Sequence, residues 1–130
     1  VVILDVKRNL FGKYEVFTHN GKVRTNKTPI ELAKLAVKFG AGEVVINSID
    51  LDGAMSGYDL ILAKNLRNAV NVPISIMGGA ANLNDMKNLF NTCGVVGAIA
   101  GSLFVFKGPL KAVLINYPYG IEKEDLVVNN

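Results

Sequence analysis

The sequence has little of what usually cross-links a small domain or holds it in a membrane. Cys93 is its single cysteine, which excludes an internal disulfide framework and favours a reducing compartment such as the cytoplasm. No apolar run approaches the roughly 18 residues that a membrane-spanning helix needs, and the first residues lack the pattern of a secretory signal. We therefore expect a cytoplasmic protein without a membrane partner.

Charge is also in short supply, since charged residues make up 19% of the 130 residues and the formal net charge is only +3. A hydrophobic content of 50% predicts one ordinary globular domain over residues 1–130. The weak positive charge suits an anionic small substrate as well as nucleic acid. No nucleic-acid-binding motif accompanies it, so we expect no nucleic-acid partner. The chain opens without methionine, inside an apolar run, and we expect it to be a fragment of a longer protein.

Four apolar runs divide the chain into repeating strand–helix units. The runs cover residues 1–6, 43–46, 72–77 and 95–100, and helical segments are predicted at 28–39, 60–70, 82–94 and 103–114, the last interrupted by Pro109. Strands this apolar are predicted to be covered on both faces. The order suits either a doubly wound sheet or part of a (β/α)8 barrel, and 130 residues is about half of the ~250 that a full barrel needs.

An insert after the first run has a different pattern. Residues 14–18 alternate, Asn20-Gly21 is typical of a type I′ turn, and residues 22–25 are placed to pair back, which predicts a β-hairpin. His19 flanks the turn and is expected to be a solvated turn residue rather than an acid–base group. The basic residues of the insert form either a solvated face or a lid over an anionic substrate: Lys13, Lys22, Arg24 and Lys27.

Local signals define the first helix after this insert. Thr28 is placed as its N-cap, with proline next and Glu31 at the third helical position, and Gly40 is placed to stop the helix. The apolar residues of its predicted buried stripe are Leu32, Leu35, Ala36 and Phe39.

Polar and small residues follow each apolar run, where ligands bind in α/β folds. Asp5 is interpreted either as a strand-end polar residue or as a carboxylate at the mouth of a site, which Lys7 and Arg8 could hold ionised. Gly78-Gly79 and Gly101-Ser102 end the third and fourth runs, each before a predicted helix start. Backbone N–H groups there predict a phosphate cradle. Two such consecutive loops, without a G-x-G-x-x-G motif, favour the barrel over the dinucleotide-binding fold.

Several of these segments carry a resemblance to a known family. They are Asp5-Val6-Lys7-Arg8, Val16-Phe17-Thr18, Gly40-Ala41-Gly42-Glu43, Ser48-Ile49-Asp50, Asp52-Gly53, Gly57-Tyr58-Asp59, Gly78-Gly79-Ala80 and Ala100-Gly101-Ser102. Over residues 1–106 the chain resembles the C-terminal half of the cyclase subunit of imidazole glycerol phosphate synthase, the HisF family. Residues 108–118 are more similar to a paralogous branch that serves acetamidino-sugar modification of surface polysaccharides.

The resemblance implies half of a (β/α)8 barrel built from four βα units with the hairpin inserted after the first strand. The family uses ammonia from a glutaminase partner to cyclise a bisphosphorylated aminoimidazole-carboxamide ribonucleotide in histidine biosynthesis, as a lyase without cofactor or metal. Asp5 matches one of two acid–base aspartates, the other lying on the missing half, and Asp52 matches a further active-site carboxylate. The backbone groups that hold the nearer phosphate match Gly53, Gly79, Gly101 and Ser102.

Some residues depart from the family pattern. Met77 replaces a usual serine, Asn47 and Leu51 replace a commoner threonine and arginine, and Ala81 replaces a common glycine. Three hypotheses therefore stay open: the histidine-pathway cyclase, the accessory ammonia-supplying barrel for sugar amidination, and an inactive half-barrel fragment or scaffold. In an isolated chain the runs at 1–6 and 95–100 would be exposed sheet edges, so we expect either a homodimer paired edge to edge or a protein of about 250 residues.

Overall fold

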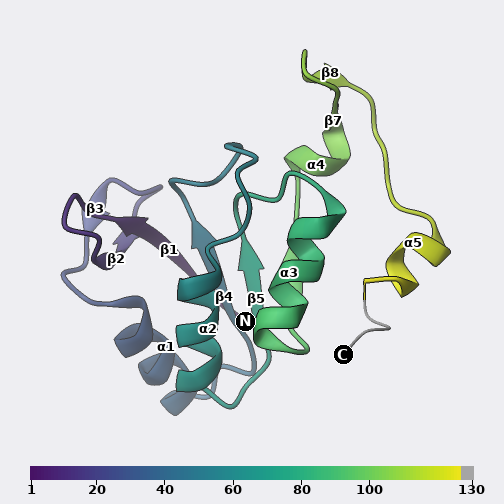
Figure 1. Ribbon diagram of the computed structural model, residues 1–130. Coiled ribbons are helices and arrows are strands. Elements are labelled where there is room, and N and C mark those ends of the chain that lie inside the picture. The colour runs from purple at the N-terminus through teal and green to yellow at the C-terminus, as the bar shows by residue number, and fades with distance from the viewer. Residues whose placement is uncertain (127–130) are drawn as a thin grey trace.

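The computed structural model describes residues 1–126 and contains a mixed sheet with helices packed on one face (Figure 1). The elements are β1 (Val2–Arg8), β2 (Tyr14–Thr18), β3 (Val23–Arg24), α1 (Pro29–Lys38), β4 (Val44–Ser48), α2 (Leu60–Ala69), β5 (Ile74–Met77), α3 (Leu83–Cys93), β6 (Gly97–Ile99), α4 (Ser102–Val105), β7 (Phe106–Lys107), β8 (Ala112–Val113) and α5 (Gly120–Glu124). No helix within residues 1–126 is long and apolar enough to cross a membrane.

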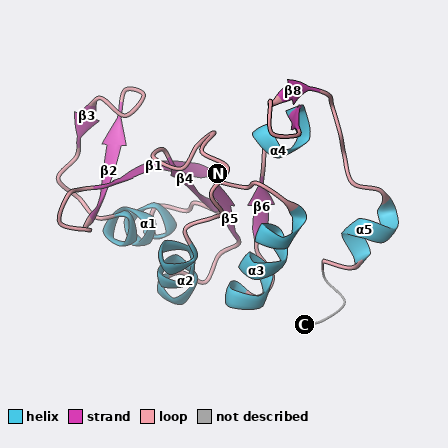
Figure 2. Cartoon of the chain, turned by 45° about the horizontal axis from the view of Figure 1, so that its top comes forward, coloured by secondary structure: helices cyan, strands magenta, loops and turns pink. Residues whose placement is uncertain are grey.

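The main sheet runs in the order β3-β2-β1-β4-β5-β6. Strands β1, β4, β5 and β6 are parallel and follow one another in chain order, which confirms the predicted βα repeat. The crossover helices α1, α2 and α3 all lie on the same face of the sheet (Figures 1 and 2). A doubly wound fold places helices on both faces, whereas a barrel places them on the outer face only, so this arrangement is that of half a (β/α)8 barrel.

The hydrophobic core lies between the sheet and these three helices. Strand register places Leu4, Ile46 and Ile76 side by side in one row, and each is at most 7% exposed. The helices cover that row with buried apolar side chains, among them Leu62 and Leu89. Burial of such a row provides most of the stabilisation of the sheet, at about 25 cal/mol for each Å² of apolar surface.

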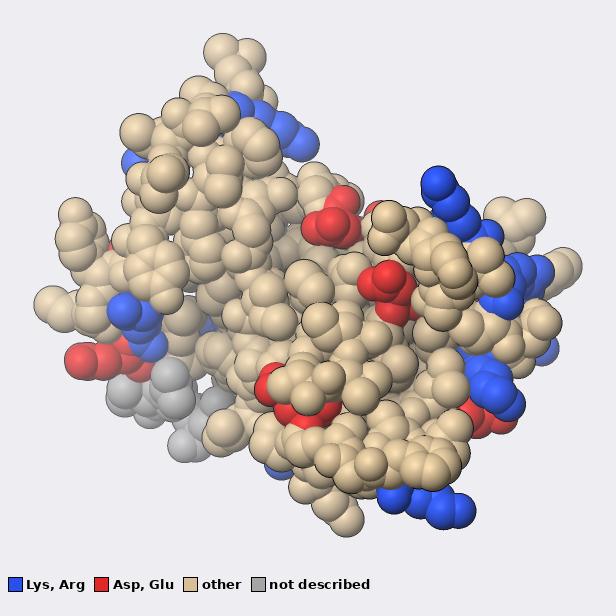
Figure 3. All heavy atoms as spheres, turned by 180° about the vertical axis from the view of Figure 1, so that it is seen from behind, with Lys and Arg blue, Asp and Glu red and all other residues tan. Residues whose placement is uncertain are grey.

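The opposite face of the sheet is more open than predicted. Ile3 is 58% exposed and Ile99 is 37% exposed, although both belong to apolar strands. Val45 and Ser75 on the same face are 4% and 8% exposed, so the central strands β4 and β5 are covered on both faces as predicted. The expectation is wrong only for the outer strands β1 and β6, because the helices all pack on the other face. Figure 3 shows this open face, with basic side chains mainly over the side that carries the hairpin and acidic ones nearer the middle.

The predicted hairpin is present and extends the sheet beyond β1. Strand β2 pairs antiparallel with the second half of β1, from Asp5 opposite Phe17 to Arg8 opposite Tyr14. The two-residue turn is wrong, because Thr18 pairs with Val23 and leaves a four-residue loop at 19–22. Three consecutive residues of that loop, 19–21, have positive φ, which tightens the loop without a type I′ turn. The hairpin also covers part of the β1 edge that was expected to be open.

The first helix confirms its predicted ends and part of its predicted stripe, since Leu32 packs against the core and Ala36 is half-buried. Thr28 and Glu31 form a capping box, and Gly40 follows the C-cap with φ 93°. Leu35 and Phe39, however, are 42% and 80% exposed. The buried residues are Pro29 and Ala33, so the face that packs on the sheet is rotated from the predicted one.

The predicted helix at residues 103–114 is wrong. Helix α4 ends at Val105, and the chain then forms the small β7–β8 hairpin, which projects beyond the main sheet (Figure 1). Gly108 has φ 74° and accepts from the N–H of Lys111, so the backbone turns where Pro109 prevents a helix from continuing. The tail from residue 121 begins inside helix α5, which ends at Glu124. Residues 127–130 lie outside the described part of the chain.

The hairpin is anchored to the helical layer by Tyr14. Its hydroxyl donates to both carboxylate oxygens of Asp59, at 3.0 and 2.9 Å. Burial, then the Asp59 hydrogen bond and charge, raise the pKa of Tyr14 from 10.0 to about 12. A pKa raised in the folded state means that this contribution to stability is fully present below pH ~10 and is lost as the pH rises through about 12.

We expect Tyr14→Phe to lower the free energy of unfolding by about 1 kcal/mol at neutral pH, because Asp59 loses a hydrogen-bond donor. The difference between wild type and variant should shrink between pH ~10 and ~12. Denaturant unfolding at several pH values measures it, with Tyr119→Phe, at an 81% exposed tyrosine, as control. A difference that does not change with pH in this range would contradict the anchor.

The open face and the β6 edge lead to a second expectation for the 130-residue chain. We expect it to sediment as a dimer, and Ile3→Lys to dissociate that dimer, because Ile3 lies on the uncovered face. Ile61→Lys is the matched control, since Ile61 is 62% exposed but lies on α2. A wild-type chain that remains monomeric at high concentration would refute the dimer.

Candidate functional site

The candidate site lies at the carboxyl ends of β4, β5 and β6. A cavity of about 160 Å³ there is lined by Asp52, Gly53, Gly79, Gly101 and Ser102, together with Met55, Met77, Gly78, Ala80, Ile99 and Ala100. Parallel register brings these strand ends to one edge of the sheet, so loops far apart in sequence meet. Five of the six predicted site residues therefore line one cavity, and Asp5 is the one outside it.

Two of the loops approach each other so closely that glycine is required. Gly78 and Gly79 have φ 96° and 100°, a region that L side chains rarely adopt. A Cβ added at Gly79 would lie 2.0 Å from the carbonyl oxygen of Gly57. The N–H of Gly57 donates to the Gly79 carbonyl at 2.8 Å, so a backbone hydrogen bond joins the two loops. This contact fixes the wall of the cavity.

The backbone of the other wall is open. A Cβ built at Gly101 has nothing within 4 Å, and Ser102 begins the short helix α4. The N-terminus of α3 is not free, because Asp85 accepts from the N–H of Ala81 at 2.8 Å and Asn82 accepts from the N–H of Asp85. The N–H groups at the start of α3 are therefore not available to a phosphate. Of the predicted cradle, the loop backbone near Gly79 and Gly101 remains.

Asp5 lies beside the cavity rather than in its wall. Strand register places it in one row with Asn47, Met77 and Ile99, two strand spacings or about 10 Å from Met77. Its carboxylate accepts from Asn47 Nδ2 at 2.9 Å. The Oδ1 atom of Asn47 is buried and has no hydrogen-bond partner among the described residues. In the sequence Asn47 stands out only as a departure from the family pattern, and no local signal indicates its contact with Asp5.

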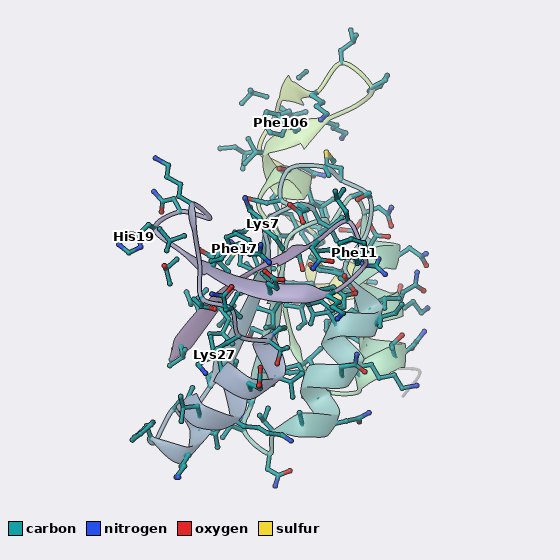
Figure 4. The ribbon with its side chains drawn as sticks, turned by 90° about the vertical axis from the view of Figure 1, so that its left-hand side faces the viewer. Lys7, Phe11, Phe17, His19, Lys27 and Phe106 are labelled. Atoms are coloured by element: carbon teal, nitrogen blue, oxygen red, sulfur yellow. The ribbon has the colours of Figure 1, made fainter. Side chains whose placement is uncertain are left out.

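Lys7 and Arg8 do not pair with Asp5, contrary to the prediction. Lys7 Nζ donates to the carbonyl of Gly21 at 3.0 Å and lies 5.1 Å from the centre of the Phe17 ring (Figure 4). Arg8 Nε donates to the carbonyl of Gly12 at 3.3 Å. Within the described residues neither forms an ion pair with Asp5. Both side chains turn toward the hairpin, which the sequence could not place relative to Asp5.

The other titratable side chains considered do not cluster into a catalytic or metal-binding site. His19 is exposed at the tip of the hairpin (Figure 4). Its Nδ1 lies 3.0 Å from Thr18 Oγ1. Residues 1–126 contain no group of three or more His, Cys, Asp or Glu side chains that could hold a metal ion. Asp50 accepts from the backbone N–H of Arg8 at 2.9 Å and joins β1 to the loop after β4. The chemistry available at the strand ends is thus that of carboxylates and backbone amides.

Sequential parallel βα units with acidic and small residues at the carboxyl ends define an α/β protein of the (β/α)8-barrel class, here with four of the eight strands. The sequence profile of a family described as histidine biosynthesis protein matches residues 1–110, and the chain belongs to this family.

Individual relatives agree with this assignment. The putative imidazole glycerol phosphate synthase subunit HisF of Leptospira interrogans is 52% identical over 127 residues, covering 97% of this chain and 50% of the relative. The putative subunit hisF3 of Vibrio vulnificus is 50% identical over 125 residues, covering 95% of this chain and 48% of the relative. The subunit HisF of Alkaliphilus metalliredigens is 38% identical over 104 residues, covering 80% and 41%. The chain is thus a homologue of HisF and spans about half the length of the curated relatives it matches.

The open wall offers a clean test of anion binding. We expect Gly101→Val to lower the affinity for inorganic phosphate at least about tenfold, because Gly101 lines the cavity and a Cβ there has no atom within 4 Å, so the substitution adds bulk at the cavity wall without an internal clash. Gly42→Val is the matched control, since Gly42 also has open space around it but lies outside the cavity. Titration calorimetry gives the affinities, and equal values for both variants would contradict the cradle. Gly79 is unsuitable, because a side chain there would collide with the Gly57 backbone.

Proposed function

We propose that this chain is the C-terminal half of a cyclase subunit of the imidazole glycerol phosphate synthase type. The observation that carries the proposal is the convergence of Asp52, Gly53, Gly79, Gly101 and Ser102 on one cavity beside Asp5, in a chain whose family profile matches residues 1–110. Relatives at 38–52% identity bear the name of this subunit.

In this proposal the cavity holds one phosphate of a bisphosphorylated aminoimidazole-carboxamide ribonucleotide. A volume of about 160 Å³ suits a phosphate group rather than a whole nucleotide, so the rest of the substrate extends over the open face toward Asp5. A phosphate bound at each end would hold the middle of the substrate near the acid–base groups. Binding energy would then be used to orient the reacting atoms. The second phosphate site and the second aspartate belong to the other half of the barrel.

Asp5 is the proposed proton-transfer group of this half. The reaction takes up ammonia, closes an imidazole ring and releases a ribotide, so protons move on and off nitrogen and oxygen at two separate places. The Asn47 amide fixes one oxygen of Asp5 and leaves the other to face the substrate. Asp52, at the exposed rim of the cavity, would act near the phosphate end. Ammonia would come from a glutaminase subunit, which the synthase-subunit name of the relatives supports.

A second candidate is the accessory barrel that supplies ammonia for acetamidino-sugar modification. Relatives at 40–52% identity are named as putative subunits, and two of them are numbered hisF2 and hisF3. Relatives named HisF without that qualification are 38–45% identical. Met77 in the cavity wall, where the family usually has serine, removes a hydroxyl donor and favours this branch. The third hypothesis, an inactive fragment, applies to the 130 residues alone, because one half-barrel lacks the second aspartate.

We expect Asp5→Asn in the complete protein to lower kcat at least about 10²-fold while substrate binding stays nearly unchanged. Asparagine keeps an oxygen that accepts from Asn47 but cannot exchange a proton. Asp125→Asn, at an exposed aspartate of the tail, is the matched control for loss of charge. A loss well below 10²-fold would remove Asp5 from this role.

Complementation separates the two branches in the same experiment. The complete gene should rescue a histidine auxotroph, and its Asp5→Asn variant should not. Failure of the wild-type gene, with phosphate binding intact, would reject the histidine-pathway function and favour the sugar branch.

A further inference from the structure

Phe17 is an aromatic side chain that the hydrophobic core does not use. Val16 points into the core and is 3% exposed, so alternation along β2 places Phe17 on the opposite, open face of the sheet. Phe17 is half-buried, and it is not among the described side chains that pack against the core. Within residues 1–126 its ring forms no aromatic pair. The packing of the sheet on its helices therefore does not account for an aromatic ring at this position.

Strand pairing places this ring directly beside Asp5. Phe17 is the antiparallel partner of Asp5, and opposite residues of such a pair point to the same face with Cβ atoms about 5 Å apart. Asp5 thus has Asn47 on one side and Phe17 on the other. Along this row Phe17 lies three strand spacings, or about 15 Å, from Met77 in the wall of the cavity at the strand ends. A ligand that extends from that cavity past Asp5 reaches the ring.

Lys7 fixes the hairpin loop beside this ring. Its ammonium lies 5.1 Å from the centre of the Phe17 ring and donates to the carbonyl of Gly21 at 3.0 Å (Figure 4). Gly21 packs closely, since an added Cβ would lie 3.1 Å from both Lys7 Cε and Ile49 Cδ1. The loop at 19–22 is therefore held against β1 and against the loop that follows β4. A cation and an aromatic ring are thus kept together on the face that carries Asp5.

The ammonium of Lys7 has no anionic partner among the described residues. Glu15 lies opposite Lys7 in the strand register, but its carboxylate accepts from Arg24 Nε at 2.7 Å instead. Within residues 1–126 the carbonyl of Gly21 is the hydrogen-bond acceptor of the ammonium, which leaves N–H donors of a half-buried cation free. A planar ring with an oxygen-bearing substituent could therefore use both groups, the aromatic surface and the donor.

We propose that Phe17 and Lys7 form the subsite for the imidazole-carboxamide ring of the substrate, an inference that rests on the proposed function. The substrate ring packs against the ring of Phe17, and its carboxamide oxygen accepts from the ammonium of Lys7. In a substrate with a phosphate at each end this ring lies between the two phosphates. The subsite then places it beside the proton-transfer group Asp5.

The first experiment measures the preference of the complete protein for the ring. Aminoimidazole-carboxamide ribonucleotide and ribose phosphate, which lacks the ring, are titrated by calorimetry, and the ratio of their affinities is the readout. Phe17→Leu should lower this ratio about fivefold or more, because a stacking surface is lost, whereas Phe17→Trp should keep it. Phe11→Leu, at a 90% exposed phenylalanine of the same insert, is the matched control. A ratio that Phe17→Leu leaves unchanged would overturn the inference.

The second experiment tests Lys7 with the same two ligands. Lys7→Met should lower the ratio about fivefold or more, since the carboxamide loses a charged donor, whereas Lys22→Met, at an exposed lysine of the hairpin loop, should not. A Lys7→Met variant with a lower melting temperature but an unchanged ratio would show that Lys7 only holds the hairpin, and would overturn its place in the subsite.

Inorganic phosphate separates this inference from the proposed function. A complete protein that binds phosphate but has equal affinity for the ribonucleotide and for ribose phosphate would overturn the ring subsite alone. A protein that binds neither phosphate nor the ribonucleotide would overturn the proposed function as well.

Discussion

The register of the four parallel strands is the constraint on which the rest of this structure depends. It aligns Leu4, Ile46 and Ile76 into one buried row, and alternation then places Asp5, Asn47 and Met77 in a row on the opposite face. A slip of one residue would exchange the two rows, moving carboxylate and amide groups into the core. The hydrophobic effect that selects the core row therefore also selects the row beside the candidate site. The same strand register therefore determines both the stability of the core and the geometry of the row beside the site.

Backbone contacts, more than side chains, shape the cavity at the strand ends. The hydrogen bond between Gly57 and Gly79 joins two loops, and the close approach leaves no room for a Cβ at Gly79. Gly101 faces open space instead. The two glycines look alike in the sequence but have different surroundings, since Gly79 touches another loop and Gly101 has open space around it. The same loops carry the resemblance to the family, which supports a function that uses them.

The hairpin decides which way the side chains at the end of β1 point. Its pairing with the second half of β1 turns Lys7 away from Asp5 and brings Tyr14 to the first turn of α2. As a result Asp5 is held by the amide of Asn47, and a second cavity forms between the insert and the helical layer. Arg8, Asp50 and Asp59 line this second cavity and not the cavity at the strand ends.

Signals contained within a few residues were predictable from the sequence, because their physics is local. The capping boxes of Thr28 with Glu31 and of Asn82 with Asp85 are examples, as are the four apolar runs and the small residues that end them. Five of the six candidate site residues also converge as predicted, since parallel strands must end at one edge. Only the tertiary structure decided the face that α1 buries, the partner of Asp5, the end of α4 at Val105 and the cavity around Ser48. Each of these depends on which distant side chains compete for the same space or hydrogen bond, and no local pattern encodes that competition.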